Sequence, residues 1–165
     1  MRGGQRGKSQ LFVPGKIEGR QYDMMLDTGA SHNVLCLNRL PLRLQQLLWE
    51  RAQPSPRTIT GAGGQETPTA GETYAMVELG GTTSRIEAVI LDDCPYGVII
   101  GMPALRELGA SLDLGTGTVR LRGQAELLPI LAMRMHGAAD QAGPGRHEEV
   151  EIPEGGMQYL SLIHI

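Results

Sequence analysis

Between Gln10 and Arg122 the apolar residues occur only in short runs, and glycine or proline interrupts most of them. Gly (23 residues) and Pro (10 residues) supply a fifth of the 165 residues, whereas aromatic residues supply only 4%. Because both residue types break helices and form tight turns, this punctuation is typical of many short strands. The pattern predicts an all-β chain with two short helices, of a size that suits one domain.

The composition divides the chain into three parts. Residues 1–9 are basic and rich in glycine, with little to bury, and we expect them to be disordered. Residues 10–122 carry the strand pattern and form the predicted domain. We expect residues 123–165 to be a linker and a poorly ordered tail, whose uncapped apolar end suggests that the true C-terminus is missing.

Alternating apolar residues and turn residues locate the expected elements of the domain. The expected strands are 11–17 with a break at Pro14, 21–26, 34–37, 57–60, 74–79, 85–91, 98–100, 111–114 and 118–121. Leucines at helical spacing predict a helix over 41–52, and Pro103 opens a second helix over 102–108. We expect Trp49 and the leucines of the first helix to pack in the core.

Charge and residue counts exclude several classes of function. A net charge of −3 makes nucleic-acid binding by this domain an unfavoured interpretation. No apolar run approaches the roughly 20 residues of a membrane helix, and we expect no membrane partner. Two cysteines are too few for a disulfide scaffold, so we expect reduced thiols and a cytoplasmic, reducing location. The histidines lack metal-ligand spacing, and we expect neither metal nor cofactor.

One carboxylate has an unusual setting. Asp27 directly follows the apolar run Met24–Leu26 and precedes Thr28 and Gly29. A carboxylate at a buried strand end has a pKa that its neighbours can adjust. The Thr28 hydroxyl can hold the turn by hydrogen bonding, and Gly29 allows other backbone to approach closely. Taken alone, the tripeptide is better explained by an ordinary Asx turn, because Asp-Thr-Gly often occurs by chance.

A second segment gives the tripeptide its meaning. The apolar run 98–100 predicts a strand buried on both faces, and it is followed by Gly101 and a helix. Together with the first hairpin, Asp27-Thr28-Gly29-Ala30 and the glycine-rich stretch 60–64, it resembles the retropepsin family. These are the single-domain aspartic proteases of retroviruses and LTR retrotransposons. The resemblance covers about residues 10–122.

The closest resemblance is to the proteases of gypsy-type LTR retrotransposons, in which Ala30-Ser31-His32 and Gly101-Met102 are typical. Retroviral members usually carry a carboxylate and an arginine, which form an ion pair, where this chain has Ser31 and Met102. That ion pair is therefore missing.

The resemblance implies a retropepsin-like acid protease fold, a closed or partly open β-barrel, and the activity of an aspartic endopeptidase. It implies catalytic roles for Asp27, Thr28 and Gly29. It also implies a flap over 60–64 that closes on an extended peptide, with no cofactor. The residues that the resemblance assigns to substrate binding are Ala30, Ser31, Gly61, Ala62, Gly63, Gly64, Ile99 and Ile100.

Aspartic proteolysis needs two facing carboxylates, of which one is protonated. This chain has a single Asp-Thr-Gly, and the other acidic candidates lie on the same strand or in turns: Asp23, Asp92, Asp93 and Asp113. The second carboxylate must then be Asp27 of another copy, which predicts a C2 homodimer. By resemblance, the substrate is the polyprotein of a retroelement.

Two other functions stay open at this point. One is a catalytically silent, domesticated protease domain that serves dimerisation or peptide binding. The other is a regulatory aspartic protease of the ubiquitin-shuttle kind, which has the same fold.

Overall fold

The structure, a computed structural model, describes residues 10–60, 64 and 66–133. Its strands are β1 (Gln10–Val13), β2 (Lys16–Ile17), β3 (Arg20–Gln21), β4 (Met24–Leu26), β5 (Val34–Leu35), β6 (Thr58–Thr60), β7 (Glu66–Pro68), β8 (Gly71–Leu79), β9 (Thr82–Ile90), β10 (Val98–Ile100), β11 (Ser111–Asp113), β12 (Thr118–Arg120), β13 (Leu128–Pro129) and β14 (Leu131–Met133). Its helices are the 3-10 turn η1 (Leu37–Arg39), α1 (Leu42–Glu50) and α2 (Met102–Glu107).

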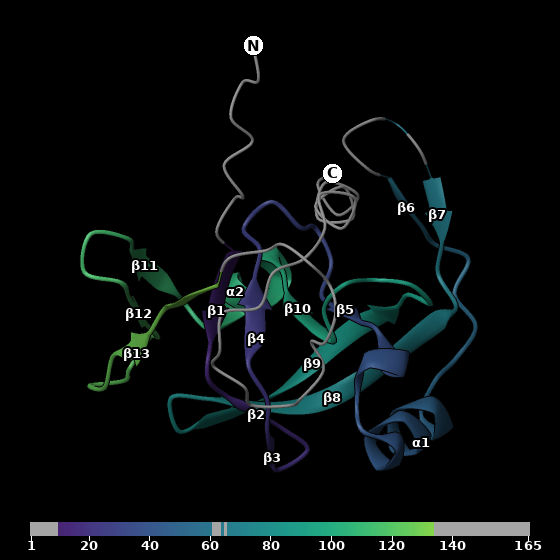
Figure 1. The fold of residues 1–165 in the computed structure, drawn as a ribbon, viewed down its shortest axis with the longest axis horizontal. Coiled ribbons are helices and arrows are strands. Elements are labelled where there is room, and N and C mark those ends of the chain that lie inside the picture. Colours follow the sequence, from purple (N-terminus) through teal and green to yellow (C-terminus); the bar gives the residue numbers. More distant parts are fainter. Residues whose placement is uncertain (1–9, 61–63, 65, 134–165) are drawn as a thin grey trace.

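Strands dominate the described residues. Nine strands form one sheet in the order β14-β1-β4-β10-β5-β9-β8-β2-β3 (Figure 1). Because β14 and β3 are the edges of this order, the sheet is open and not a closed barrel. The predicted mostly-β fold with two short helices is confirmed in this open form. Neither α1 nor α2 is long and apolar enough to cross a bilayer, nor is any other helix of the described part.

β10 lies in the interior of the sheet, between β4 and β5, and is buried on both faces, as its apolar sequence predicts. It runs parallel to β4 and antiparallel to β5. Ile99 packs in one core cluster, with Met25 and Val34, whereas Ile100 packs in the other. Successive side chains of a strand point to opposite faces, so this short strand joins the two clusters of the core.

α1 lies beside β8, on the opposite side of the molecule from β11–β13 (Figure 1). Of the leucines at helical spacing in α1, Leu44 and Leu48 are buried. Leu42 and Trp49, in contrast, are 66% and 54% exposed, which corrects the expectation that they pack in the core. The physical reason is rotation around the helix, since adjacent residues lie about 100° apart and Trp49 follows the buried Leu48.

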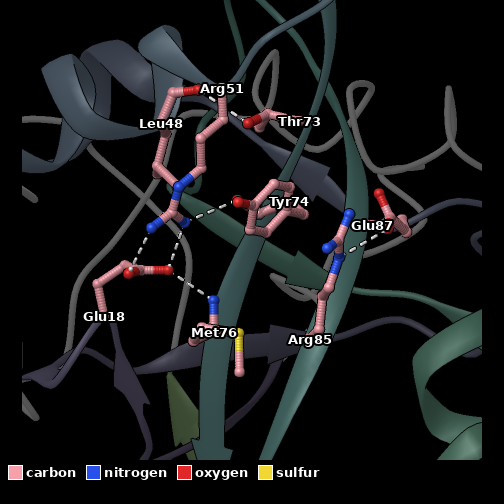
Figure 2. Close-up of polar contacts among 8 residues, drawn as sticks. All are labelled: Glu18, Leu48, Arg51, Thr73, Tyr74, Met76, Arg85 and Glu87. Atoms are coloured by element: carbon pink, nitrogen blue, oxygen red, sulfur yellow. Dashed lines mark hydrogen bonds and ion pairs between the residues drawn. The ribbon is translucent and has the colours of Figure 1, made fainter.

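A cluster of charged and aromatic side chains attaches α1 to the sheet (Figure 2). Arg51, directly after α1, donates two hydrogen bonds to the carboxylate of Glu18, at 2.8 and 3.1 Å. The same carboxylate accepts the N–H of Met76 in β8 at 2.6 Å. Glu18 has a left-handed φ of 49° in the turn between β2 and β3. The cations of Arg51 and Arg85 lie over the ring of Tyr74, at 4.6 and 3.8 Å from its centroid.

Paired strands continue beyond the expected end of the domain at residue 122. β13 pairs with β12, and β14 pairs with β1 at the edge of the large sheet. Residues 128–133, expected to be linker, therefore belong to the fold, because the apolar stretch around Leu131 packs against the core. The other parts of that prediction, residues 1–9 and 134–165, lie outside the described residues.

Two predicted strands are shortened by interruptions of more than one residue. The strand expected over 21–26 divides into β3 and β4, and the one expected over 34–37 ends at Leu35, before η1 begins. The closing hairpin forms as predicted, with β11 antiparallel to β12.

Candidate active site

Asp27 begins a tight turn directly after β4, at the end of a strand that is fully buried. Its side-chain Oδ1 accepts the N–H of Gly29 at 2.9 Å, and its carbonyl accepts the N–H of Ala30 at 3.1 Å. Asp27 itself is half-buried, whereas Thr28 is exposed. The carboxylate is thus held in one orientation by the backbone that follows it, and the Thr28 hydroxyl contributes no hydrogen bond to this turn within the described residues.

β10 and the start of α2 hold the loop that carries Asp27. The Asp27 N–H donates to the carbonyl of Ile100 at 2.9 Å, and the Met102 N–H donates to the carbonyl of Ala30 at 2.8 Å. Gly101 lies between these two contacts. A Cβ atom on Gly101 would overlap the carbonyl oxygen of His32 and lie 2.9 Å from that of Ala30. The glycine after the apolar run is therefore required by close backbone packing.

Asn33 closes the same loop, although the sequence pattern alone did not indicate it. Its Oδ1 accepts the N–H of Gly101 at 2.8 Å, and its Nδ2 donates to the carbonyl of Glu87 in β9 at 3.0 Å. The residue is only 6% exposed. A polar residue directly before an apolar strand is the signal that would have indicated it, since buried amides are retained where both ends are hydrogen-bonded.

The residues that were predicted to contact substrate differ in how far their side chains are exposed. Ile99 and Ile100 are 0% and 1% exposed, and Ala30 is 0% exposed. Their side chains pack in the core and offer no surface to a peptide, which corrects that prediction. Ser31, in contrast, is half-buried and lies in the same loop as Asp27.

The predicted flap lies between β6 and β7, which pair antiparallel and project from one end of the molecule (Figure 1). Gly61, Ala62 and Gly63 fall outside the described residues. Gly64 has a left-handed φ of 83° with open space around it. At the base of the hairpin, Ile59 is fully buried in the core cluster that also contains Ala30 and Val34. This contact fixes the base of the hairpin to the core beneath the Asp27 loop.

The cysteines offer no competing chemistry. Burial raises the pKa of Cys36 to about 11 and that of Cys94 to about 12, so both are neutral thiols near pH 7. The thiolate is the reactive form of cysteine, and neither residue suits a nucleophile. Among the described residues no group of His, Cys, Asp and Glu side chains could hold a metal ion.

One family model and several solved structures are similar to this chain. The model of the aspartyl protease family matches residues 13–104, more than half of the chain. The retroviral protease-like domain of Ddi1 from Leishmania major is similar in structure, with a TM-score of 0.59 and 18% identity over 74% of this chain and 96% of that domain. The EIAV protease complexed with the inhibitor HBY-793 gives a TM-score of 0.45 and 24% identity, over 69% of this chain and 99% of that one. No curated protein matches the chain.

The match covers the Asp27 turn, β10 and the start of α2, the elements that hold the candidate site together. The chain therefore belongs to the aspartyl protease family and carries a retropepsin-like protease domain.

Proposed function

We propose that this protein is an aspartic endopeptidase that is active as a homodimer and cleaves the polyprotein of a retroelement. One observation carries the proposal: Asp27 is held in a backbone-defined turn at the end of a buried strand, and each chain has a single Asp-Thr-Gly. Two copies related by a two-fold axis would supply the two carboxylates that the reaction needs. The exposed Thr28 beside Asp27 leaves this surface accessible to a second copy.

In this mechanism the two Asp27 carboxyl groups share one proton, because like charges at such short range do not both ionise. The ionised carboxylate acts as a general base and removes a proton from the attacking water. The protonated one polarises the carbonyl of the scissile bond. The backbone hydrogen bonds around Asp27 keep the carboxylate oriented, so little ordering remains to be done when the substrate binds.

The test compares two substitutions at carboxylates with the same local geometry. Oδ1 of Asp27 accepts the N–H of Gly29 at 2.9 Å, and Oδ1 of Asp113 accepts the N–H of Gly115 at 2.9 Å. Asp27→Asn should lower peptide cleavage by about 10³-fold, because the amide cannot act as a base. Asp113→Asn should leave cleavage unchanged.

Sedimentation of the full chain, run with the cleavage assay over a concentration series, tests the dimer. Activity should follow the dimer fraction, and a statine-type transition-state mimic should inhibit it. An Asp27→Asn protein with full activity would contradict the role of Asp27, and a fully active monomer would contradict the dimer. A wild-type dimer that cleaves nothing would favour the non-catalytic alternative.

A further inference from the structure

A chain of three polar side chains runs from the base of the β6–β7 hairpin into the Asp27 loop. Nη1 of Arg57, the residue before β6, lies 3.4 Å from Nε2 of His32. Nδ1 of His32 lies 3.0 Å from the hydroxyl of Ser31. The Arg57 guanidinium also donates to the Glu72 carboxylate at 3.2 Å, and the Arg57 carbonyl accepts both the N–H and the hydroxyl of Thr69.

Arg57 fixes the direction of the two hydrogen bonds that connect it through His32 to Ser31. A guanidinium has only donors, so Nε2 of His32 must be the acceptor and carries no proton. The proton of the neutral imidazole is then on Nδ1, which donates to the oxygen of Ser31. A hydroxyl has one donor hydrogen, and accepting from His32 leaves it available. Within the described residues the Ser31 hydroxyl has no other partner, and Ser31 is half-buried.

We propose that Arg57 and His32 are positioning residues that hold the Ser31 hydroxyl as a hydrogen-bond donor toward the substrate. The site would then select an oxygen acceptor, a carbonyl or carboxylate, at the substrate position that faces Ser31. This inference rests on the proposed function. A carboxylate in place of Ser31 would accept hydrogen bonds. The Ser31 hydroxyl, held by His32 and Arg57, would instead donate one at this edge of the site.

The charges around His32 keep it neutral. Burial and the adjacent Arg57 cation lower the pKa of His32 below its usual 6.5, whereas the Glu72 carboxylate acts in the opposite sense. Glu72 is in turn hydrogen-bonded to Ser55, which lowers its own pKa and keeps it ionised. The Arg57–His32 hydrogen bond therefore persists into the mildly acidic range and is lost only when Nε2 of His32 takes up a proton, because an imidazolium has no acceptor.

The first measurement is independent of activity. Nitrogen-15 NMR of the wild-type imidazoles, with the His32 signals identified by their loss in His32→Phe, reports which nitrogen is protonated. We expect Nδ1–H for His32 in the wild type and a His32 pKa that rises in Arg57→Gln. Arg85→Gln is the matched control: Arg85 is 56% exposed and donates to Glu87 at 3.0 Å, against 53% and 3.2 Å for Arg57 and Glu72.

The second measurement is cleavage of a mixed peptide library. Ser31→Ala, His32→Phe and Arg57→Gln should each lower kcat/KM by about fivefold through KM, the size expected for one hydrogen bond, whereas Arg85→Gln should not. A loss confined to peptides with Asn, Gln, Asp or Glu at one position would identify a side-chain acceptor. A uniform loss would identify a backbone carbonyl.

The pH profile distinguishes positioning from a general structural role. In the wild type kcat/KM should fall when acidification protonates Nε2 of His32 and removes its contact with Arg57, whereas in Arg57→Gln, which lacks this contact from the start, that step should be absent. An Nε2–H tautomer in an active wild-type protein, or a kcat/KM that Ser31→Ala lowers for no peptide of the library, would overturn the inference. A wild-type protein that cleaves no peptide would instead count against the proposed function.

Discussion

Oδ1 of Asn33 accepts the backbone N–H of Gly101 across 2.8 Å, joining two residues that are 68 positions apart in the chain. Nδ2 of the same side chain donates to the carbonyl of Glu87. One buried amide thus connects the end of the Asp27 loop, the turn after β10 and strand β9. The hydrogen bond to Gly101 is buried and the one to Glu87 is part-buried, so losing the first would leave a buried backbone N–H unpaired.

Replacing Asn33 should therefore be costly. Asn33→Ala should lower the free energy of unfolding by about 3 kcal/mol, since it leaves the buried N–H of Gly101 and the part-buried carbonyl of Glu87 without this partner. Asn33→Asp keeps an acceptor for Gly101 but cannot donate to Glu87 when ionised. Burial raises the pKa of the new carboxyl above the unfolded value of about 4, so stability should be recovered below that pH and lost as pH rises. Urea unfolding at pH 4 and pH 7 measures both effects.

Gly101→Ala should disrupt the site and the fold together. The new methyl group would overlap the carbonyl of His32, and backbone on both sides leaves no flexible side chain to move. We expect a loss of about 3 kcal/mol in the free energy of unfolding, the upper range of overpacking. Gly117→Ala is the control, since Gly117 has open space and only its φ of 69° opposes a side chain. It should cost about 1 kcal/mol.

The Glu18–Arg51 pair should stabilise the protein in a pH-dependent way. Burial raises the pKa of Glu18, but hydrogen bonds from Arg51 and the Met76 N–H outweigh it, and the pKa lies below 4.5. A carboxylate with a lowered pKa stabilises the fold above its unfolded pKa, and this contribution is lost as pH falls. Glu18→Gln should cost about 1.5 kcal/mol at pH 7 and less at pH 3 in urea unfolding.

Glu78→Gln is the comparison for this pair. Glu78 and Lys16 lie 3.9 Å apart and are 37% and 45% exposed. Exposed pairs contribute little, so the change should stay below about 0.5 kcal/mol. Equal effects of Glu18→Gln and Glu78→Gln would show that the Glu18 cluster is not a stabilising contact.

Two adjacent residues of α1 should respond in opposite ways. Leu48 is fully buried and Trp49 is 54% exposed. Leu48→Ala should lower the free energy of unfolding by about 3 kcal/mol through lost burial and a residual cavity, whereas Trp49→Ala should cost less than about 1 kcal/mol. Trp49 is the sole tryptophan of the chain, so its emission should be quenched readily by a soluble quencher in the folded protein.

The thiols should be protected in the folded state. Cys36 and Cys94 are buried, with pKa values raised to about 11 and about 12. Alkylation at pH 8 should therefore be slow in the native protein and fast in urea, because reaction requires an exposed thiolate. Rapid labelling without denaturant would show that this part of the core opens easily.

Local pattern was sufficient for the parts of the fold that depend on neighbours in sequence. The leucine spacing located α1, and the apolar run 98–100 identified β10 as a strand buried on both faces. The pairing of β14 with β1 joins residues at opposite ends of the domain, and alternation within residues 128–133 carries no information about that partner.

In the candidate site too, local sequence identified some residues and missed those whose role depends on distant partners. Asp27 was identified by its position after an apolar run, and the likeness between its surroundings and a known family supplied the rest. Asn33 was missed because its function depends on Gly101 and Glu87, which are distant in sequence. Ile99 and Ile100 were assigned to the substrate, but their place in the middle of the sheet buries both side chains.

β10 pairs with β4 through Ile100 and Leu26, and with β5 through Ile99 and Val34. The seven residues from 27 to 33 therefore connect β4 and β5, whose positions are both fixed by pairing with β10. An insertion or deletion there would shift one of the strands by a residue and turn its side chains to the opposite face. Changes in the chemistry of this loop that keep both strand registers therefore come from substitution, at positions such as Ser31 and His32, and not from changes in its length.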